Sequence, residues 1–238
     1  MHPGPRAVSR VQLFATCLGD LVFPQAVADA ATLLAACGVE VEFPSAQVCC
    51  GQPAFNAGHR SAARRVGRTF ARAFSRNLPI VVPSGSCAAM IALRLPELLG
   101  CEPYTVFELS AFLDDASVPL EQVNEATEVG YHASCHMLRE LHVDAAPKRL
   151  LERTGATIVP LRRPDLCCGF GGTFSVRQPE VSVAMADDKL ASAPGTAALV
   201  TADPGCLMQL SSRSARIGGT PVVHLATALA RGVRAAAA

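Results

Sequence analysis

The chain has 238 residues, of which 50% are hydrophobic, so it can bury a sizeable core as one large domain or as two units of roughly 100 to 120 residues. Its formal net charge is +1 and it contains no long run of Lys or Arg, which argues against binding to nucleic acid or to an anionic membrane surface. The longest uncharged stretch, 77–93, is interrupted by prolines and glycine, unlike a membrane-spanning helix, so we expect a cytoplasmic protein that does not insert into a membrane.

Strands and helices alternate along the first half of the sequence. Apolar or alternating runs predict strands at 11–14, 39–43, 80–82 and 106–110. Helical spacing predicts helices at 24–37 and 61–77, and a leucine-rich helix after the last strand. The helix at 61–77 carries five arginines, which we interpret as a solvated surface; the alternative is a face that meets an acidic partner.

The second half repeats this order. Strands are predicted at 129–132, 157–159, 198–200 and 222–226, with a helix at 146–153 and an alanine-rich helix at the end. The polar stretch 114–128 is the natural linker, which gives two domains, 1–118 and 119–238. We therefore predict an α/β fold made by tandem duplication, each unit having a largely parallel sheet flanked by helices, with pseudo-two-fold symmetry between the units.

Eight of the ten cysteines follow the same duplication. In each half, a single cysteine is followed after 31 residues by a Cys-Cys-Gly triplet, and 36 or 37 residues separate the second cysteine of the triplet from another single cysteine. The first set is Cys17, Cys49, Cys50 and Cys87, and the second set is Cys135, Cys167, Cys168 and Cys206. The single cysteines follow apolar strands, so we expect both sets at the carboxyl edge of a sheet, where α/β proteins place their ligands.

Four thiolates in one place suit an iron–sulfur cluster or a zinc ion. Disulfides are the alternative, but the first 24 residues show no secretory signal pattern, and adjacent cysteines pair poorly with each other. The glycines after each Cys-Cys pair suit a backbone that directs amide N–H groups at the sulfurs of a cluster. For Gly171 and Gly172, a simple tight turn explains the glycines equally well.

The doubled Cys-Cys-Gly motif resembles the cysteine-rich CCG domain of heterodisulfide reductases and of the glycolate oxidase iron–sulfur subunit. Four stretches resemble most closely the lactate-utilisation protein A family: 85–90 (GSCAAM), 131–141 (YHASCHMLREL), 166–175 (LCCGFGGTFS) and 205–209 (GCLMQ). The resemblance covers essentially the whole chain. It implies iron–sulfur electron transfer in the oxidation of L-lactate to pyruvate, together with a ferredoxin-like protein and a third utilisation protein.

One feature departs from the wider family pattern. In heterodisulfide reductase subunits the last cysteine opens a Cys-x-x-Cys pair, and five cysteines hold a non-cubane cluster, whereas here Met90 and Gln209 stand at the second position. Four thiolates per site still suit a [4Fe–4S] cluster or zinc. Two alternatives therefore remain open: thiol or disulfide redox chemistry of the heterodisulfide reductase type, and a zinc-stapled scaffold with no redox role.

The other candidate residues have weaker signals. Cys37 and Cys101 lack counterparts in the other half, so we interpret them as core or helix-end residues. His136, next to Cys135, is a candidate proton relay and is otherwise a surface residue, while we expect His132 and His224 to be structural. No nucleotide-binding or flavin-binding motif occurs. We therefore expect a non-autonomous subunit of a lactate oxidoreductase complex.

Overall fold

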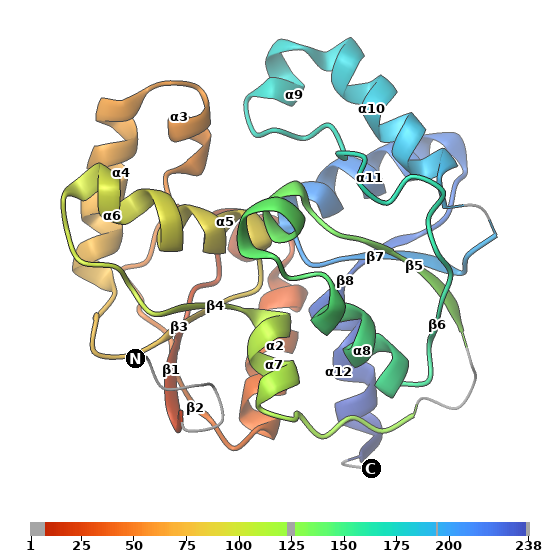
Figure 1. Cartoon of the computed structure of the whole chain (residues 1–238), viewed down its shortest axis with the longest axis horizontal. Helices are drawn as coiled ribbons and strands as arrows, with labels where there is room; N and C mark the ends of the chain where they lie inside the picture. The colour runs from red at the N-terminus through yellow and green to blue at the C-terminus, as the bar shows by residue number, and fades with distance from the viewer. Residues whose placement is uncertain (1–7, 123–126, 194, 237–238) are drawn as a thin grey trace.

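The computed structural model describes residues 8–122, 127–193 and 195–236, in which strands and helices alternate (Figure 1). The first half contains β1 (Arg10–Leu13), α1 (Cys17–Val22), α2 (Pro24–Ala36), β2 (Glu40–Glu42), α3 (Gln52–Asn56), α4 (Arg60–Ala73), β3 (Ile80–Val82), α5 (Gly85–Ala89), the π-helical turn η2 (Met90–Arg94), α6 (Leu95–Leu99), β4 (Val106–Glu108) and α7 (Leu109–Asp115). The second half contains β5 (Glu128–His132), the π-helical turn η3 (Met137–Leu141), α8 (Ala145–Arg153), β6 (Thr157–Ile158), α9 (Phe174–Arg177), α10 (Pro179–Ala191), β7 (Ala198–Thr201), α11 (Pro204–Ile217), β8 (Val222–His224) and α12 (Leu225–Ala236).

The strands form two four-stranded parallel sheets with the same topology. The strand order is β2-β1-β3-β4 in the first sheet and β6-β5-β7-β8 in the second, so the second strand of each half lies at an edge and the first lies inside. The fully apolar β3 is buried throughout, whereas β2, with its alternating charges, is partly exposed. The predicted α/β duplication with parallel sheets is confirmed.

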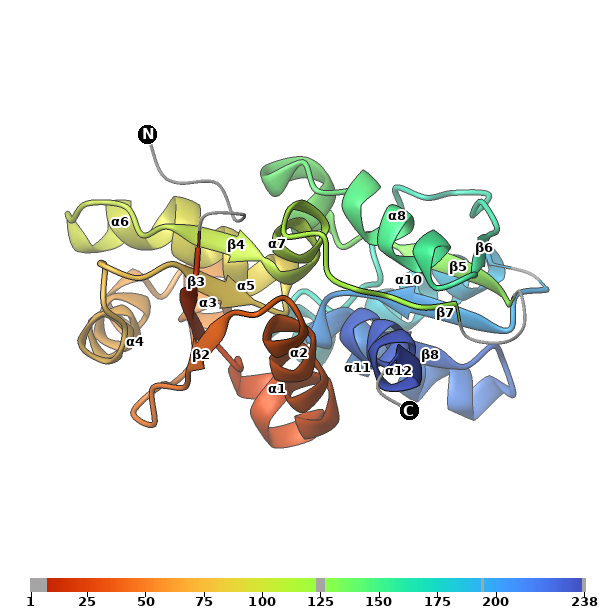
Figure 2. The same cartoon turned by 90° about the horizontal axis from the view of Figure 1, so that it is seen from below.

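The two halves pack against each other through equivalent helices. Helix α2 contacts α12, and α7 contacts α8; under the duplication α2 corresponds to α8 and α7 to α12, so these are the same contact made twice. One continuous hydrophobic core joins the halves and includes Leu33, Phe112, Leu150 and Leu229. Figures 1 and 2 show these four helices gathered between the two sheets, as the predicted pseudo-two-fold symmetry requires.

Three predicted elements end earlier than the sequence indicated. The helix predicted to reach residue 77 ends at Ala73, because the side chain of Gln12 accepts from the backbone N–H of Ser75 and donates to its carbonyl, at 2.8 Å each, which holds this segment extended. The strands predicted at 106–110 and 222–226 end at Glu108 and His224. Each of these side chains accepts hydrogen bonds from backbone N–H groups just beyond it, so the helix begins there.

The predicted linker, 114–128, runs from the last residues of α7 to the first residue of β5, and the predicted domain boundary lies within it. Residues 123–126 lie outside the described residues, and the boundary at 118/119 stays a prediction. Arg153 of α8 donates to the carbonyl of Val118, which fixes the first part of this segment against the second half. Among the described residues, no helix combines the length and apolar character needed to cross a membrane.

Glu108 should make stability depend on pH. Its carboxyl group is buried, and burial raises its pKa to about 7 from the ordinary 4.5. The folded state therefore favours the protonated form, so its contribution is full below about pH 4.5 and is lost as pH rises through about 7. At 1.36 kcal/mol per unit, the free energy of unfolding should fall by at most about 3 kcal/mol over this range.

Denaturant unfolding of the wild type and of Glu108→Gln, from about pH 5 to pH 8, checks this expectation. We expect a flatter pH profile for Glu108→Gln and an unchanged profile for the exposed control Glu180→Gln. Identical pH profiles for wild type and Glu108→Gln would show that Glu108 does not titrate in this way.

Candidate metal centres

The single cysteines of both sets lie where a strand passes into a helix. Cys17 begins α1 after β1, and Cys87 lies in the first turn of α5 after β3. In the second half, Cys135 follows β5 and Cys206 lies in the first turn of α11 after β7. All four therefore occupy the carboxyl edges of the sheets.

Capping side chains fix all four turns; in the turn of Cys135, Ser134 Oγ accepts a hydrogen bond from the backbone N–H of Met137 at 3.4 Å. Thr16 Oγ1 accepts from the backbone N–H of Gly19 at 3.1 Å, and Ser84 Oγ accepts from that of Cys87 at 3.3 Å. Asp203 caps α11, where its Oδ1 accepts hydrogen bonds from the backbone N–H groups of Gly205 and Cys206. Each cap satisfies N–H groups that would otherwise lack a partner and so sets the direction of the following cysteine.

The structure brings each set of four cysteines to one cavity. In the first set, the Sγ atoms of Cys17 and Cys49 are 3.7 Å apart and those of Cys50 and Cys87 are 3.3 Å apart, and all four residues line the same cavity. In the second set, the Sγ atoms of Cys168 and Cys206 are 3.1 Å apart. Cys135 and Cys167 line the same cavity as these two cysteines.

The glycine after each Cys-Cys pair has a backbone that a side chain would strain. Gly51 and Gly169 have φ angles of 89° and 85°, in the left-handed region. A Cβ on Gly169 would also lie 2.4 Å from the carbonyl oxygen of Ser182 in α10. This conformation aims the backbone N–H of each glycine at a cysteine sulfur, Cys49 in the first half and Cys167 in the second, at 3.4 Å. The sequence-based expectation of N–H groups directed at sulfur corresponds to these two contacts.

Each set contains one cysteine with pronounced thiolate character. Hydrogen bonding from Cys17 holds the pKa of Cys49 well below its ordinary value, and Cys135 does the same for Cys167. The pKa values of the donors Cys17 and Cys135 are raised in turn, chiefly by the same bonds. Thiols that share protons in this way release them when a cation binds, because the metal ligand is the thiolate.

Each cavity is closed by residues of the other half. Phe170, Gly172, Thr173 and Val176 of the second half line the cavity of the first set. Gln52 and Asn56 of the first half line the cavity of the second set. Because Gln52, Phe170 and Gly172 line both, the two cavities adjoin at the interface between the halves.

Asp203 links the two sites across this interface. Besides capping α11, its Oδ2 accepts from the backbone N–H of Ser86 at 2.8 Å and from Ser84 Oγ at 3.2 Å, both in the first half. Asp203 is buried, so every one of these donors depends on it. Sequence reasoning did not identify this residue, since the contact joins positions 117 and 119 residues apart.

Replacing Asp203 by Ala should therefore lower the free energy of unfolding by more than the loss of a helix cap alone. We expect the free energy of unfolding to fall by about 3 kcal/mol, of which a cap alone accounts for about 1 kcal/mol. The matched control is Thr16→Ala, which removes a cap without a contact between the halves. Urea unfolding measures the free energy of unfolding of both variants, provided that their m-values equal that of the wild type. Equal losses of stability in the two variants would rule out a bridging role for Asp203.

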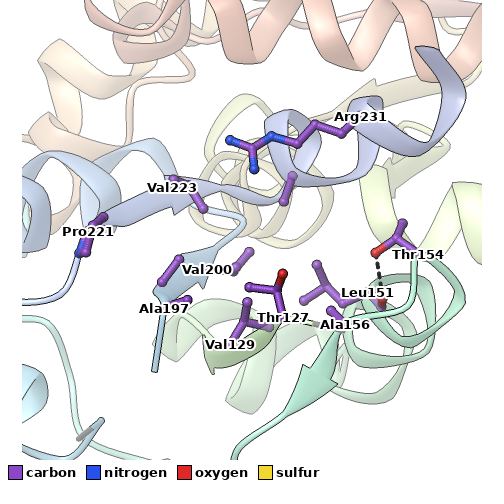
Figure 3. A pocket seen from close by; sticks show the side chains of 12 residues that line it. Thr127, Val129, Leu151, Thr154, Ala156, Ala197, Val200, Pro221, Val223 and Arg231 are labelled. Carbon is purple, nitrogen blue, oxygen red and sulfur yellow. Dashed lines mark hydrogen bonds between the residues drawn. The ribbon is translucent and has the colours of Figure 1, made fainter. Parts of the chain in front are cut away.

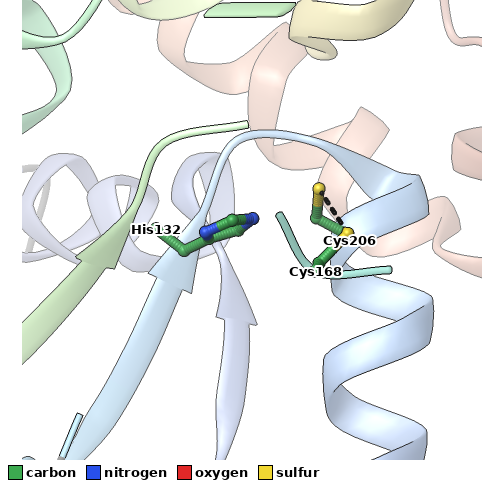
Figure 4. A group of neighbouring side chains, drawn as sticks. All are labelled: His132, Cys168 and Cys206. Atoms are coloured by element: carbon green, nitrogen blue, oxygen red, sulfur yellow. Dashed lines mark hydrogen bonds between the residues drawn. The ribbon is translucent and has the colours of Figure 1, made fainter. Parts of the chain in front are cut away.

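A histidine accompanies the second set. Figure 4 shows the ring of His132, at the end of β5, pointing toward Cys168 and Cys206, and one potential ligand atom from each residue lies within 4.8 Å of the others. His132 is fully buried, and neither ring nitrogen has a hydrogen-bond partner among the described residues. The sequence indicated a structural residue here, and its position three residues before Cys135 was the available signal for a site residue.

The remaining candidates lie around the two cavities or away from them. His136 lines the second cavity, and its Nε2 lies 3.0 Å from Gln52 Nε2 across the interface. Cys37 and Cys101 each follow the end of a helix, are partly buried and line neither cavity, and His224 caps α12. The arginines of α4 and of the segment after it are exposed: Arg64, Arg65, Arg68, Arg72 and Arg76.

A separate pocket lies at the opposite end of the second sheet. Its lining comes from the first residues of β5, β7 and β8, and from α8 and α12 (Figure 3). The side chains are mainly apolar, Arg231 is the charged one, and none is Cys or His. This pocket therefore does not share in the chemistry of the cysteine sets.

Comparisons with known proteins agree with the repeat. Residues 11–92 and 129–211 each match the cysteine-rich domain family named CCG. Lactate utilization protein A of Exiguobacterium sp. is 40% identical over 95% of this chain and 99% of its own length, and that of Geobacillus kaustophilus is 40% identical over 92% and 98%. Among solved structures, a glutamate racemase of Bacillus anthracis covers 97% of this chain and 82% of its own, but with 12% identity and a TM-score of 0.39 it supports no inference. Two CCG domains and close relatives along nearly the full length place the chain in the lactate utilization protein A family.

Proposed function

We propose that this chain is the iron–sulfur electron-transfer subunit of a multi-protein system that oxidises L-lactate to pyruvate. The observation that carries the proposal is the pair of adjoining cavities, each lined by four cysteines at the carboxyl edge of a parallel sheet. The relatives named lactate utilization protein A support the link to lactate.

The residues present fit such a cofactor. Each cavity offers four sulfur donors, one of them already thiolate-like, with a backbone N–H bonded to sulfur. Cys17, Cys49, Cys50 and Cys87 would hold the first group, and Cys135, Cys167, Cys168 and Cys206 the second. A [4Fe–4S] cluster needs four thiolates, and zinc in one or both sites is the alternative that the same donors allow.

When bound, iron–sulfur clusters supply one-electron transfer at a potential that the protein adjusts. The chain's own part is to hold the sulfurs, to direct N–H groups at them and to cover the sites with residues of the opposite half, such as Phe170. His136, beside the second cavity and held near Gln52, is our proposed proton relay. A role in thiol or disulfide chemistry is less well supported, because Met90 and Gln209 replace the fifth cysteine.

The proposed partners are a ferredoxin-like iron–sulfur protein and a third lactate-utilisation protein. The exposed arginines around α4 offer a positively charged face to such a partner, and electrostatic attraction of this kind weakens with salt. The chain has no nucleotide or flavin motif, so it needs partners to complete a redox cycle.

Reconstitution tests the proposal. We expect little oxidation of L-lactate by the isolated chain and its restoration when both companion proteins are added, measured as pyruvate formed with an artificial electron acceptor. The rate at limiting partner concentration should fall as salt is raised. Full turnover by this chain alone would make it an enzyme in its own right and would overturn the subunit assignment.

A further inference from the structure

The two cysteine sets differ at one equivalent position. His132 and Phe14 each stand three residues before the first cysteine of their set, and both are fully buried. His132 is the last residue of β5, and Phe14 directly follows β1. The first half thus places a benzene ring where the second half places an imidazole.

The imidazole of His132 is directed at the second site. Its ring points toward Cys168 and Cys206, as Figure 4 shows, and within the described part of the chain neither of its buried nitrogens has a hydrogen-bond partner. An imidazole ring carries at least one N–H in either protonation state, so His132 can donate a hydrogen bond to a neighbouring sulfur. Burying this group without a partner costs about 1–3 kcal/mol, so such a residue points to a ligand beside it.

The wider surroundings of the two cysteine sets also differ, being polar around the second set and aromatic around the first. Lys189 of α10 is fully buried and donates from Nζ to the carbonyls of Arg163 and Pro164, in the loop that leads to Cys167. The first set instead packs in a cluster with Phe14, Phe70 and Phe74, whose rings have centroids 4.4 to 5.4 Å apart. A polar environment, with Lys189 and the carboxylate of Asp203, thus adjoins the second set, and an aromatic one adjoins the first.

We propose that His132 donates its ring N–H to a sulfur of the group held by the second cysteine set, and that this site consequently has the higher reduction potential of the two. The inference rests on the proposed function, because it requires a redox group in each set. A hydrogen bond to sulfur stabilises the reduced state, which carries one more negative charge. Reduction here adds one electron and makes or breaks no bond, so an electron shared by the two sites should reside mainly on the second.

An EPR-monitored redox titration of the full chain, purified anaerobically and reduced with dithionite, tests the proposal. We expect two potentials in the wild type, with the higher one absent from Cys168→Ala. His132→Phe, which copies Phe14, should lower only the higher potential, by about 59 mV, which is a tenfold change in the one-electron equilibrium constant. His132→Gln, whose amide can still donate, should keep most of the wild-type value.

The iron and sulfide content of every variant is measured, so that loss of a cluster can be distinguished from a change in its potential. If His132→Phe does not retain the second cluster, His132→Leu provides the same comparison with a smaller apolar side chain. Two clusters in the wild type and an unchanged higher potential in the apolar variant would overturn this inference and leave the proposed function intact. A wild type without iron and sulfide would defeat both.

Discussion

Replacing Cys168 by Ala should abolish the metal site of the second half and, with it, lactate oxidation by the assembled system. Cys168 is buried and its sulfur lies 3.1 Å from that of Cys206, so the substitution removes one of the four sulfur donors from the interior of the site. We expect the loss of about half of the bound iron and a fall in activity of at least about 100-fold, the upper end of what changes around a metal site cost.

Cys101→Ala is the matched control, since Cys101 lines neither cavity. It should keep both the iron content and the activity of the wild type. Iron per chain, measured next to pyruvate formation by the reconstituted system, checks both variants. Full iron and full activity in Cys168→Ala would show that the second site has been assigned to the wrong residues.

Gly169→Ala should be among the most destabilising single changes in the chain. The new Cβ would meet the carbonyl oxygen of Ser182 at 2.4 Å, and the φ angle of 85° is itself unfavourable for alanine. The left-handed conformation alone costs about 1–2 kcal/mol. The clash with backbone adds to this, so we expect a total loss of at least about 3 kcal/mol together with loss of the second metal site.

Gly58→Ala isolates the effect of backbone conformation. Gly58 has a φ of 82°, but no atom of the described residues lies within 4 Å of its added Cβ. The free energy of unfolding of the Gly58→Ala variant should be lower than that of the wild type by about 1–2 kcal/mol, and its iron content should be unchanged. Denaturant unfolding and iron analysis of both variants provide the comparison, and equal losses of stability would mean that the loop tolerates a side chain at Gly169.

The repeat in the sequence was sufficient to predict the fold. Cysteine spacing and the order of strands indicated two equivalent α/β units, because a parallel sheet, its crossovers and its carboxyl edge follow from local patterns. The ends of the elements were less predictable. Gln12 holds the chain extended after α4, and Glu108 ends β4, through side-chain hydrogen bonds that the hydrophobic pattern of the sequence does not indicate.

The parts of the site that the sequence did not indicate all depend on tertiary contacts. Asp203 joins segments far apart in the chain, and Phe170 covers the cavity of the opposite half. The setting of His132 depends on how β5 packs beside Cys168 and Cys206, and a histidine ending an apolar strand is compatible with a structural role.

Analysis of iron, acid-labile sulfide and zinc in anaerobically purified protein, with its visible and EPR spectra, tests the central claim most directly. Two [4Fe–4S] clusters predict about eight iron and eight sulfide ions per chain, a brown colour and an EPR signal that appears or disappears on reduction. A colourless protein with zinc in both sites, and neither iron nor sulfide, would contradict the electron-transfer function.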